Sequence, residues 1–295
     1  MSFVATLISH PDRRALSEDI AHRAAEAVGA SAIDWLDASV ACDLALPDAL
    51  PAEGADARLR DLLSLVPVDI VVQDVARRRK KLLIADMDST MIDQECIDEL
   101  ADEVGIKEHV AAITARSMNG EIAFEPALRE RVALLRGMPV SVIGEIVDKR
   151  ITLASGGREL VATMRAAGAW TALVSGGFDA FTRPIAARLG FQENHANRLV
   201  EEDGRLAGTV VEPILGRAAK ARSLESISAR LGITPNDAIA VGDGANDLDM
   251  LALAGTGVAL HAKPAVAAAA RVRIDHGDLT ALLYLQGFRR RDFVS

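Results

Sequence analysis

The stretch Leu82-Leu83-Ile84-Ala85-Asp86-Met87-Asp88-Ser89-Thr90 decides the fold class of this chain. Its four leading apolar residues form an unbroken run that predicts a buried strand of a parallel sheet. Ligands of open α/β sheets bind at the carboxyl ends of the strands, so we expect chemistry in the polar residues that follow. Asp86 and Asp88 can both reach one point if the chain turns, and one could attack while the other transfers protons. Taken alone, the pattern also fits an ordinary loop and helix cap.

Two later segments repeat this pattern of a short apolar run followed by a small polar loop. Residues 172–174 lead into Ser175-Gly176-Gly177, and residues 238–241 lead into a loop over residues 242–247. Small residues after the first run let phosphate oxygens approach a hydroxyl and backbone N–H groups, although a tight turn explains them equally well. The second loop crowds three oxygen-bearing side chains together, namely Asp243, Asn246 and Asp247. That density favours a hard cation such as Mg²⁺.

Composition is that of a soluble globular protein. The chain has 295 residues, half of them hydrophobic, a formal net charge of −9 and two cysteines, Cys42 and Cys96. The acidic balance provides no basic footprint for nucleic acid, and two cysteines are too few for a disulfide framework or a zinc site. We find no basic leader and no charge-free run of membrane-spanning length. We therefore expect a cytoplasmic protein that binds neither nucleic acid nor membrane.

The first 79 residues predict a separate small domain. Strand patterns at residues 3–8, 32–46 and 68–75 alternate with helix patterns at residues 17–28 and 57–65. This βαββαβ order indicates a ferredoxin-like α+β domain with an antiparallel sheet. The basic run that follows, residues 77–81, is expected to be a solvated linker into a second domain over residues 80–295.

Residues from about 94 to 157 predict a helical cap inserted directly after the first motif. Apolar residues at helical spacing alternate here with breaks at glycine and proline. A cap in this place can cover the site, exclude water and select the substrate. Glu95 suits an ammonium group, and Arg131 offers a planar fork for a carboxylate or phosphate. Both residues are equally typical of a solvated helix surface.

In order and context, the motifs resemble those of haloacid-dehalogenase-like (HAD-like) phosphatases. The resemblance rests on residues 86–90, on Ser175-Gly176-Gly177, on residues 242–247, and on Lys220 in a predicted helix that runs to Leu231. Without this context, a lone helix lysine is normally a surface residue. The resemblance covers roughly residues 80–288 and implies a Rossmann-like parallel sheet with an inserted cap.

A narrower resemblance is to the members of this family that hydrolyse phosphoserine. It is carried by Asp93-Gln94-Glu95, by residues 124–132 in the cap, and by the strong hairpin signal Asp203-Gly204. The N-terminal region is similar in layout to the ACT-type domains that precede such enzymes in some bacteria, although no motif in it matches. An amino-acid ligand at that domain and a homodimer are compatible with this layout.

The resemblance implies roles for individual residues. Asp86 would be the nucleophile that forms an aspartyl-phosphate, and Asp88 would act as acid and then as base. Asp86, the backbone carbonyl of Asp88, and Asp243 would bind Mg²⁺. Four residues would hold the phosphoryl group: Ser175, Gly176, Lys220 and Asn246. Glu95 and Arg131 would bind the ammonium and carboxylate groups of phosphoserine.

Two alternatives remain open at this point. The first keeps the fold and changes the reaction, to a related small-molecule phosphomonoesterase or to a phosphotransferase that passes the phosphoryl group to an alcohol such as homoserine. The second is an amino-acid-sensing protein whose site has lost activity. The presence of Asp86, Asp88, Lys220 and Asp243 argues against the second alternative.

Overall fold

The computed structural model describes residues 2–295 and divides the chain into two compact units. The first unit contains the described part of Met1–Lys81 together with Ser155–Ala169 and Val272–Ser295. The second contains Leu82–Ala154 and Trp170–Arg271. We expected the first domain to end at residue 79, which leaves out the two later segments of the first unit. The domain boundaries stay a prediction. No helix among the described residues is long and apolar enough to cross a membrane.

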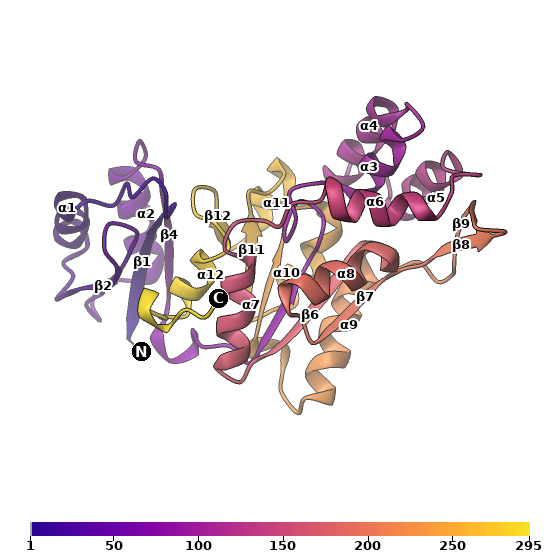
Figure 1. Cartoon of the computed structure of the whole chain (residues 1–295). Helices are drawn as coiled ribbons and strands as arrows, with labels where there is room; N and C mark the ends of the chain where they lie inside the picture. The colour runs from indigo at the N-terminus through magenta and orange to yellow at the C-terminus, as the bar shows by residue number, and fades with distance from the viewer. Residues whose placement is uncertain (1) are drawn as a thin grey trace. The chain divides into compact units, whose positions relative to one another are not determined.

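The first unit contains an antiparallel four-stranded sheet with the strand order β2-β3-β1-β4. Figure 1 labels β1, β2 and β4 of this sheet. Its strands are β1 (Phe3–Ser9), β2 (Ile33–Asp37), β3 (Ala41–Ala45) and β4 (Val68–Asp74). Two helices, α1 (Glu18–Val28) and α2 (Ala52–Leu62), contribute to its apolar core. This arrangement agrees with the predicted ferredoxin-like fold.

The helix boundaries in this unit follow from local capping. Ser17 accepts a hydrogen bond from the N–H of Ile20, and Gly29 ends α1 in the left-handed conformation with φ of 63°. The sequence prediction for α2 was wrong at its start, because the helix begins at Ala52 directly after Pro51 and runs through Gly54. Pro51 is the N-cap of α2, and its missing N–H costs nothing there because the backbone N–H groups at a helix start have no intrahelical partner.

Later segments of the chain complete the first unit. They are α7 (Gly157–Ala166), β12 (Val272–Ile274) and α12 (Ala281–Leu285). The buried carboxylate of Asp69 on β4 accepts hydrogen bonds from three successive backbone N–H groups, those of Asp275, His276 and Gly277. The predicted solvated run over residues 77–81 needs correction at Arg78, which is mostly buried and pairs with Asp43 at 2.5 Å, whereas Arg77, Arg79 and Lys81 are exposed.

The second unit is built on parallel strands in the order β11-β10-β5-β6-β7. Their bounds are β5 (Leu82–Ala85), β6 (Trp170–Phe178), β7 (Glu193–Asn197), β10 (Ala238–Gly242) and β11 (Thr256–Leu260). The three apolar runs predicted as parallel strands are therefore the neighbours β10, β5 and β6. Their carboxyl ends meet at one edge of the sheet, which is where the polar loops follow.

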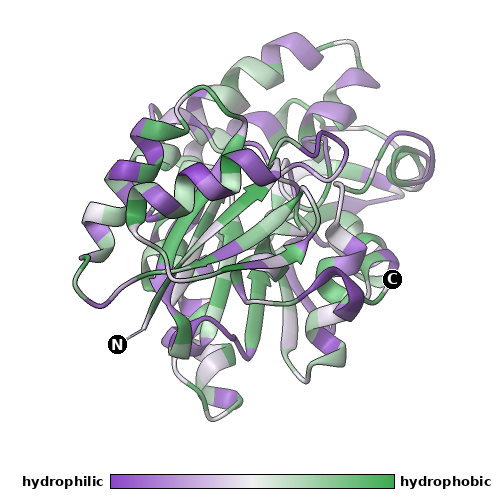
Figure 2. Ribbon diagram, turned by 90° about the vertical axis from the view of Figure 1, so that its left-hand side faces the viewer, coloured by the Kyte–Doolittle hydropathy of each residue, from purple (hydrophilic) through white to green (hydrophobic). Residues whose placement is uncertain are grey.

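Alternate residues of these strands pack under helices. Leu82 and Ile84 of β5 join a buried apolar cluster with Leu224, Met250 and residues of the neighbouring strands. This face is covered by α9 (Arg217–Arg230), α10 (Leu248–Leu253) and α11 (Pro264–Ala269), and α8 (Asp179–Leu189) contacts β6 and β7. Figure 2 shows the hydrophobic colouring concentrated in the strands, while the helices carry both colours. This is the pattern of a sheet buried on both faces.

The predicted cap is present as helices α3 to α6 of the second unit. Their bounds are α3 (Cys96–Asp102), α4 (Lys107–Met118), α5 (Phe124–Ala133) and α6 (Ser141–Lys149). Two linkers join them to the sheet and bond to each other, since Ile92 pairs with Leu153 as an isolated bridge. The predicted hairpin is β8 (Leu199–Glu202) and β9 (Arg205–Val210), with Asp203 and Gly204 at positive φ.

The sequence prediction placed the end of β6 too early. The strand continues through Ser175-Gly176-Gly177 to Phe178, and its pairing with β7 shifts register between Val174 and Phe178. The glycines are therefore part of an irregular strand end. We predicted only the hairpin in the part of the sequence that follows, and did not predict β7.

Candidate active site

Three strand ends and the cap enclose one cavity in the second unit. Residues from the loops after β5, β6 and β10 line it together with residues of the cap. The predicted site residues among its lining are Asp86, Asp88, Glu95, Arg131, Gly176, Asp243 and Asn246. Ser175 and Lys220 lie behind this wall and contact it by hydrogen bonds. The structure thus brings the predicted residues together, and their chemical roles remain predictions.

Asp86 is held at the end of β5 by three contacts. Its N–H donates to the carbonyl of Val241 on β10, which fixes the backbone against the neighbouring strand. Its Oδ1 accepts the N–H of Met87 at 2.7 Å and lies 2.7 Å from Nζ of Lys220. The carboxylate is 4% exposed and borders the cavity, so it is both fixed and reachable.

Lys220 is a buried cation, which excludes the surface position typical of a helix lysine. Its side chain is 0% exposed, and Nζ lies 2.7 Å from Oδ1 of Asp86 and 2.7 Å from Oδ1 of Asp247. Burial alone lowers the pKa of the amine, but the charges of Asp247 and Asp86 outweigh it and raise the pKa above its ordinary value. The lysine therefore stays charged.

Asp86, Asp243 and Asp247 form a buried acidic cluster. One oxygen from each carboxylate lies within 4.8 Å of the others. Burial, followed by the charge of Asp86, raises the pKa of Asp243 to about 7, and the same two causes raise the pKa of Asp247 well above its usual range. Oδ2 of Asp243 and Oδ1 of Asn246 are buried without a hydrogen-bond partner among the described residues. Crowded oxygens that lack donors fit a hard divalent cation.

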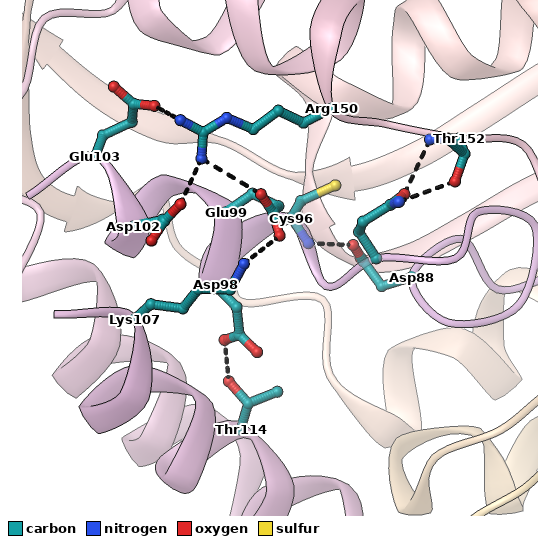
Figure 3. Close-up of polar contacts among 11 residues, drawn as sticks. Asp88, Cys96, Asp98, Glu99, Asp102, Glu103, Lys107, Thr114, Arg150 and Thr152 are labelled. Atoms are coloured by element: carbon teal, nitrogen blue, oxygen red, sulfur yellow. Dashed lines mark hydrogen bonds and ion pairs between the residues drawn. The ribbon is translucent and has the colours of Figure 1, made fainter. Parts of the chain in front are cut away.

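Asp88 has the surroundings of a proton carrier. Its Oδ1 accepts the N–H of Cys96, the first residue of α3, at 2.8 Å (Figure 3), and its Oδ2 accepts the hydroxyl of Ser175 at 3.2 Å. Burial, followed by the charge of Asp86, raises the pKa of Asp88. A fixed carboxyl group that ionises less readily than usual is suited to donate a proton and then to accept one.

Glu95 lies at the start of α3 and faces the same cavity. The hydroxyl of Ser89, a residue with φ of 53°, donates to Oε1 of Glu95 at 2.7 Å. Burial, followed by the charge of Asp88, raises the pKa of Glu95 well above its ordinary value. A positive group bound beside Glu95 would relieve that repulsion.

Arg131 lies on α5 and is one of the largest buried side chains. It is 2% exposed, so the alternative of a solvated helix residue is wrong. Its Nε donates to the carbonyl of Ala127 at 3.1 Å, and its Nη1 donates to the hydroxyl of Thr114 at 2.9 Å. The cavity therefore has a buried guanidinium in its cap wall, together with the carboxylate of Glu95.

The glycines at the end of β6 are required by close packing. A Cβ on Gly176 would lie 2.6 Å from the ring of Phe124, and a Cβ on Gly177 would lie 2.7 Å from Oδ2 of Asp88. Any side chain here would displace Phe124 of the cap or the carboxylate of Asp88. Phe124, Ser89 and Asp247 are site residues that the sequence prediction did not assign. Asp247 had a signal in the sequence as the third oxygen-bearing residue of its loop, whereas Ser89 and Phe124 lie within the quoted motifs but received no role of their own.

Comparisons with known proteins agree with this geometry. The family model described as haloacid dehalogenase-like hydrolase matches residues 83–252, more than half of the chain. The phosphoserine phosphatase of Albidiferax ferrireducens is 48% identical over 210 residues, which cover 70% of this chain and 89% of that protein.

Two further relatives differ in how much of them the chain covers. The phosphoserine phosphatase of Archaeoglobus fulgidus is 45% identical over 208 residues, which are 70% of this chain but only 60% of that protein. A solved phospho-aspartyl intermediate analogue of phosphoserine phosphatase is 41% identical, with a TM-score of 0.67 and coverage of 70% of this chain and 98% of that one. The chain belongs to the haloacid dehalogenase-like hydrolases.

Proposed function

We propose that this chain is a phosphoserine phosphatase that hydrolyses O-phospho-L-serine to L-serine and phosphate, the last step of serine biosynthesis. The observation that carries the proposal is the enclosure of Asp86, Asp88, Glu95 and Arg131 in one cavity. The two carboxylates of Asp86 and Asp88 suit phosphoryl transfer, and the Glu95 carboxylate together with the Arg131 guanidinium suits the two charged groups of an amino acid. The names of the relatives support the same substrate.

The reaction begins with attack of Asp86 on phosphorus, which forms an aspartyl-phosphate and breaks the bond to the serine oxygen. Asp88 gives its proton to that oxygen, and serine leaves as an alcohol. Asp88 then takes a proton from water as the water attacks the aspartyl-phosphate and frees Asp86. The fixed positions of the two side chains supply the orientation.

A phosphate dianion repels an incoming carboxylate, so positive charge must be present before Asp86 can attack. Lys220 provides part of it from 2.7 Å away. We assign a Mg²⁺ site to Asp86, the backbone carbonyl of Asp88 and Asp243, with Asp247 beside them. The ion would neutralise charge on the phosphoryl oxygens. Ser175, Gly176 and Asn246 would add donors around the same group.

The cap would recognise the amino-acid part of the substrate. Glu95 would pair with the ammonium group and Arg131 with the carboxylate, each through a charge-assisted hydrogen bond. A cytoplasmic location, a homodimer and an amino-acid ligand at the N-terminal domain also remain proposals.

Phosphate release from a substrate panel tests this function. The panel contains phosphoserine, phosphoethanolamine without the carboxylate, phosphoglycolate without the amine, and an aryl phosphate. We expect phosphoserine to have the highest kcat/KM, and we expect activity to disappear after chelation and to return with Mg²⁺. Equal rates on all four substrates would contradict the assigned substrate. Transfer of phosphate to added homoserine at the expense of release would identify a phosphotransferase.

A further inference from the structure

The guanidinium of Arg131 on α5 is held by Thr114 of α4, which in turn contacts Asp98 of α3. What we infer from these contacts rests on the function proposed above. Two of the three guanidinium nitrogens already have protein acceptors, namely Ala127 for Nε and Thr114 for Nη1. The described residues show no hydrogen bond for Nη2. The hydrogen bonds of Nε and Nη1 therefore fix the direction in which Nη2 points.

Thr114 lies on α4 and is 3% exposed. Its hydroxyl accepts from Arg131 at 2.9 Å and lies 2.7 Å from Oδ1 of Asp98 and 3.0 Å from the carbonyl of Val110. A hydroxyl has one proton, and the shorter, charged acceptor is Asp98. The hydrogen bonds then run in one direction, from Arg131 through Thr114 to Asp98 (Figure 3 shows the last step).

This chain of hydrogen bonds joins three cap helices, because Asp98 lies on α3, Thr114 on α4 and Arg131 on α5. The carboxylate of Asp98 also supplies negative charge near the buried guanidinium. A charged group that is hydrogen-bonded on one side is held in one orientation and needs no reorganisation when a substrate arrives.

We propose that Thr114, supported by Asp98, is a positioning residue that aims Arg131 at the carboxylate of the substrate and so sets its preference for amino-acid phosphates. Neither residue lines the cavity, and both act through Arg131. The chain offers a matched control in Ser117, which lies on the same helix, is 5% exposed, and has a hydroxyl without a hydrogen-bond partner among the described residues.

Steady-state kinetics on phosphoserine and phosphoethanolamine test the proposal, after thermal unfolding has shown that each variant folds. Thr114→Val keeps the shape and removes the hydroxyl. We expect kcat/KM for phosphoserine to fall about 10- to 100-fold, mainly through KM, since the lost contact is to a charged group. Activity on phosphoethanolamine should change less than about twofold, because that substrate has no carboxylate. Thr114→Ser should restore most of the loss, and Ser117→Ala should match the wild type on both substrates.

A double-mutant cycle separates positioning from general damage to the cap. In an Arg131→Ala background, Thr114→Val should change the substrate ratio no further, because the residue acts only through the arginine. Independent, additive losses would overturn the proposal. If Thr114→Val does not fold, Asp98→Asn provides the same test, with a smaller loss confined to phosphoserine, and an equal loss on both substrates would overturn the proposal.

The outcomes also distinguish a failure of the proposed function from a failure of the role given to Thr114. A wild-type enzyme with no preference for phosphoserine refutes the proposed function and this inference together. A wild-type preference that Thr114→Val leaves intact refutes only the role of Thr114.

Discussion

Asp69 in the first unit and Asp243 in the second are both buried carboxylates, 5% and 3% exposed, but their surroundings are opposite. Asp69 accepts three backbone N–H groups at 2.8, 3.1 and 2.7 Å. Asp243 has one hydroxyl, that of Thr90, at 3.3 Å from Oδ1, and its Oδ2 has no hydrogen bond within residues 2–295. Asp69 is saturated with hydrogen-bond donors, whereas Asp243 has within the described chain only one long hydroxyl contact and a distant ion pair, between its Oδ2 and Nζ of Lys263 at 3.7 Å.

We interpret this difference as that between an acid that stabilises the fold, Asp69, and one that would bind a cation in the proposed reaction, Asp243. Burial raises the pKa of both groups, and three N–H groups oppose that shift at Asp69. At Asp243 the second cause is the negative charge of Asp86, so the carboxylates repel one another. Repulsion of this kind costs stability in the free protein and is relieved by a cation.

The largest expected effect is that of Asp86→Asn. An amide cannot form the aspartyl-phosphate, so kcat for phosphoserine should fall by more than about 10⁴-fold, beyond the range typical of lost proton transfer. Phosphate release in the presence of saturating Mg²⁺ measures it. The matched control is Asp69→Asn, which changes a buried carboxylate of the other unit and should retain activity. Near-normal turnover in Asp86→Asn would exclude the covalent mechanism.

Asp88→Asn should have a smaller effect on the same reaction. It retains the nucleophile and loses the proton carrier, so we expect kcat to fall by about 10²- to 10⁴-fold. An aryl phosphate with a good leaving group needs less help from an acid, and its first step should be less affected. A burst of released phenol in Asp88→Asn would show this step directly. If Asp88→Asn slows the first step equally for phosphoserine and for the aryl phosphate, Asp88 is not the acid that protonates the leaving group.

For Asp69→Asn we expect a loss of stability and no loss of chemistry. An amide presents one acceptor oxygen to N–H groups that now bond to both oxygens of Asp69, so buried donors lose partners. The free energy of unfolding should fall by about 1–3 kcal/mol, and denaturant unfolding measures it. A stability equal to that of the wild type would show that these hydrogen bonds do not hold the first unit together.

The smallest expected effect is a pH dependence of stabilisation by Mg²⁺. The folded, metal-free protein has the pKa of Asp243 raised from 3.8 to about 7. Ionisation of this group therefore destabilises the free protein as the pH rises through 7, whereas the cation binds the ionised form. The increase in Tm that Mg²⁺ produces should be about 2–4 °C larger at pH 8 than at pH 6. A larger increase in Tm at pH 6 than at pH 8 would contradict the predicted direction of this pH dependence.

Much of the second unit could be predicted from local sequence. The apolar runs before Asp86, Ser175 and Gly242 each form a parallel strand, and the loops after them meet at the cavity. Periodicity and turn chemistry act over a few residues, so they are readable in one sequence. Glu95 lines the cavity, as its position shortly after the first motif predicted.

Features that depend on distant contacts could not be predicted. The bonds of Asp69 connect residues more than 200 positions apart, and no local pattern indicates them. Arg131 is buried and bonds to Thr114 of a different helix, and helical spacing does not specify which neighbouring helix faces a residue. The last residues of β6 include two glycines because the ring of Phe124 and the carboxylate of Asp88 leave no room for a side chain, and both contacts come from residues distant in the sequence.

Calorimetric titration with Mg²⁺ at pH 8 tests the central contrast most directly, because it needs no substrate. We compare the wild type with Asp243→Asn and Asp69→Asn. Our expectation is one Mg²⁺ bound per chain in the wild type and in Asp69→Asn, and an affinity at least about 100-fold lower in Asp243→Asn. Equal Mg²⁺ affinity in Asp243→Asn and the wild type, or loss of binding in Asp69→Asn, would contradict it.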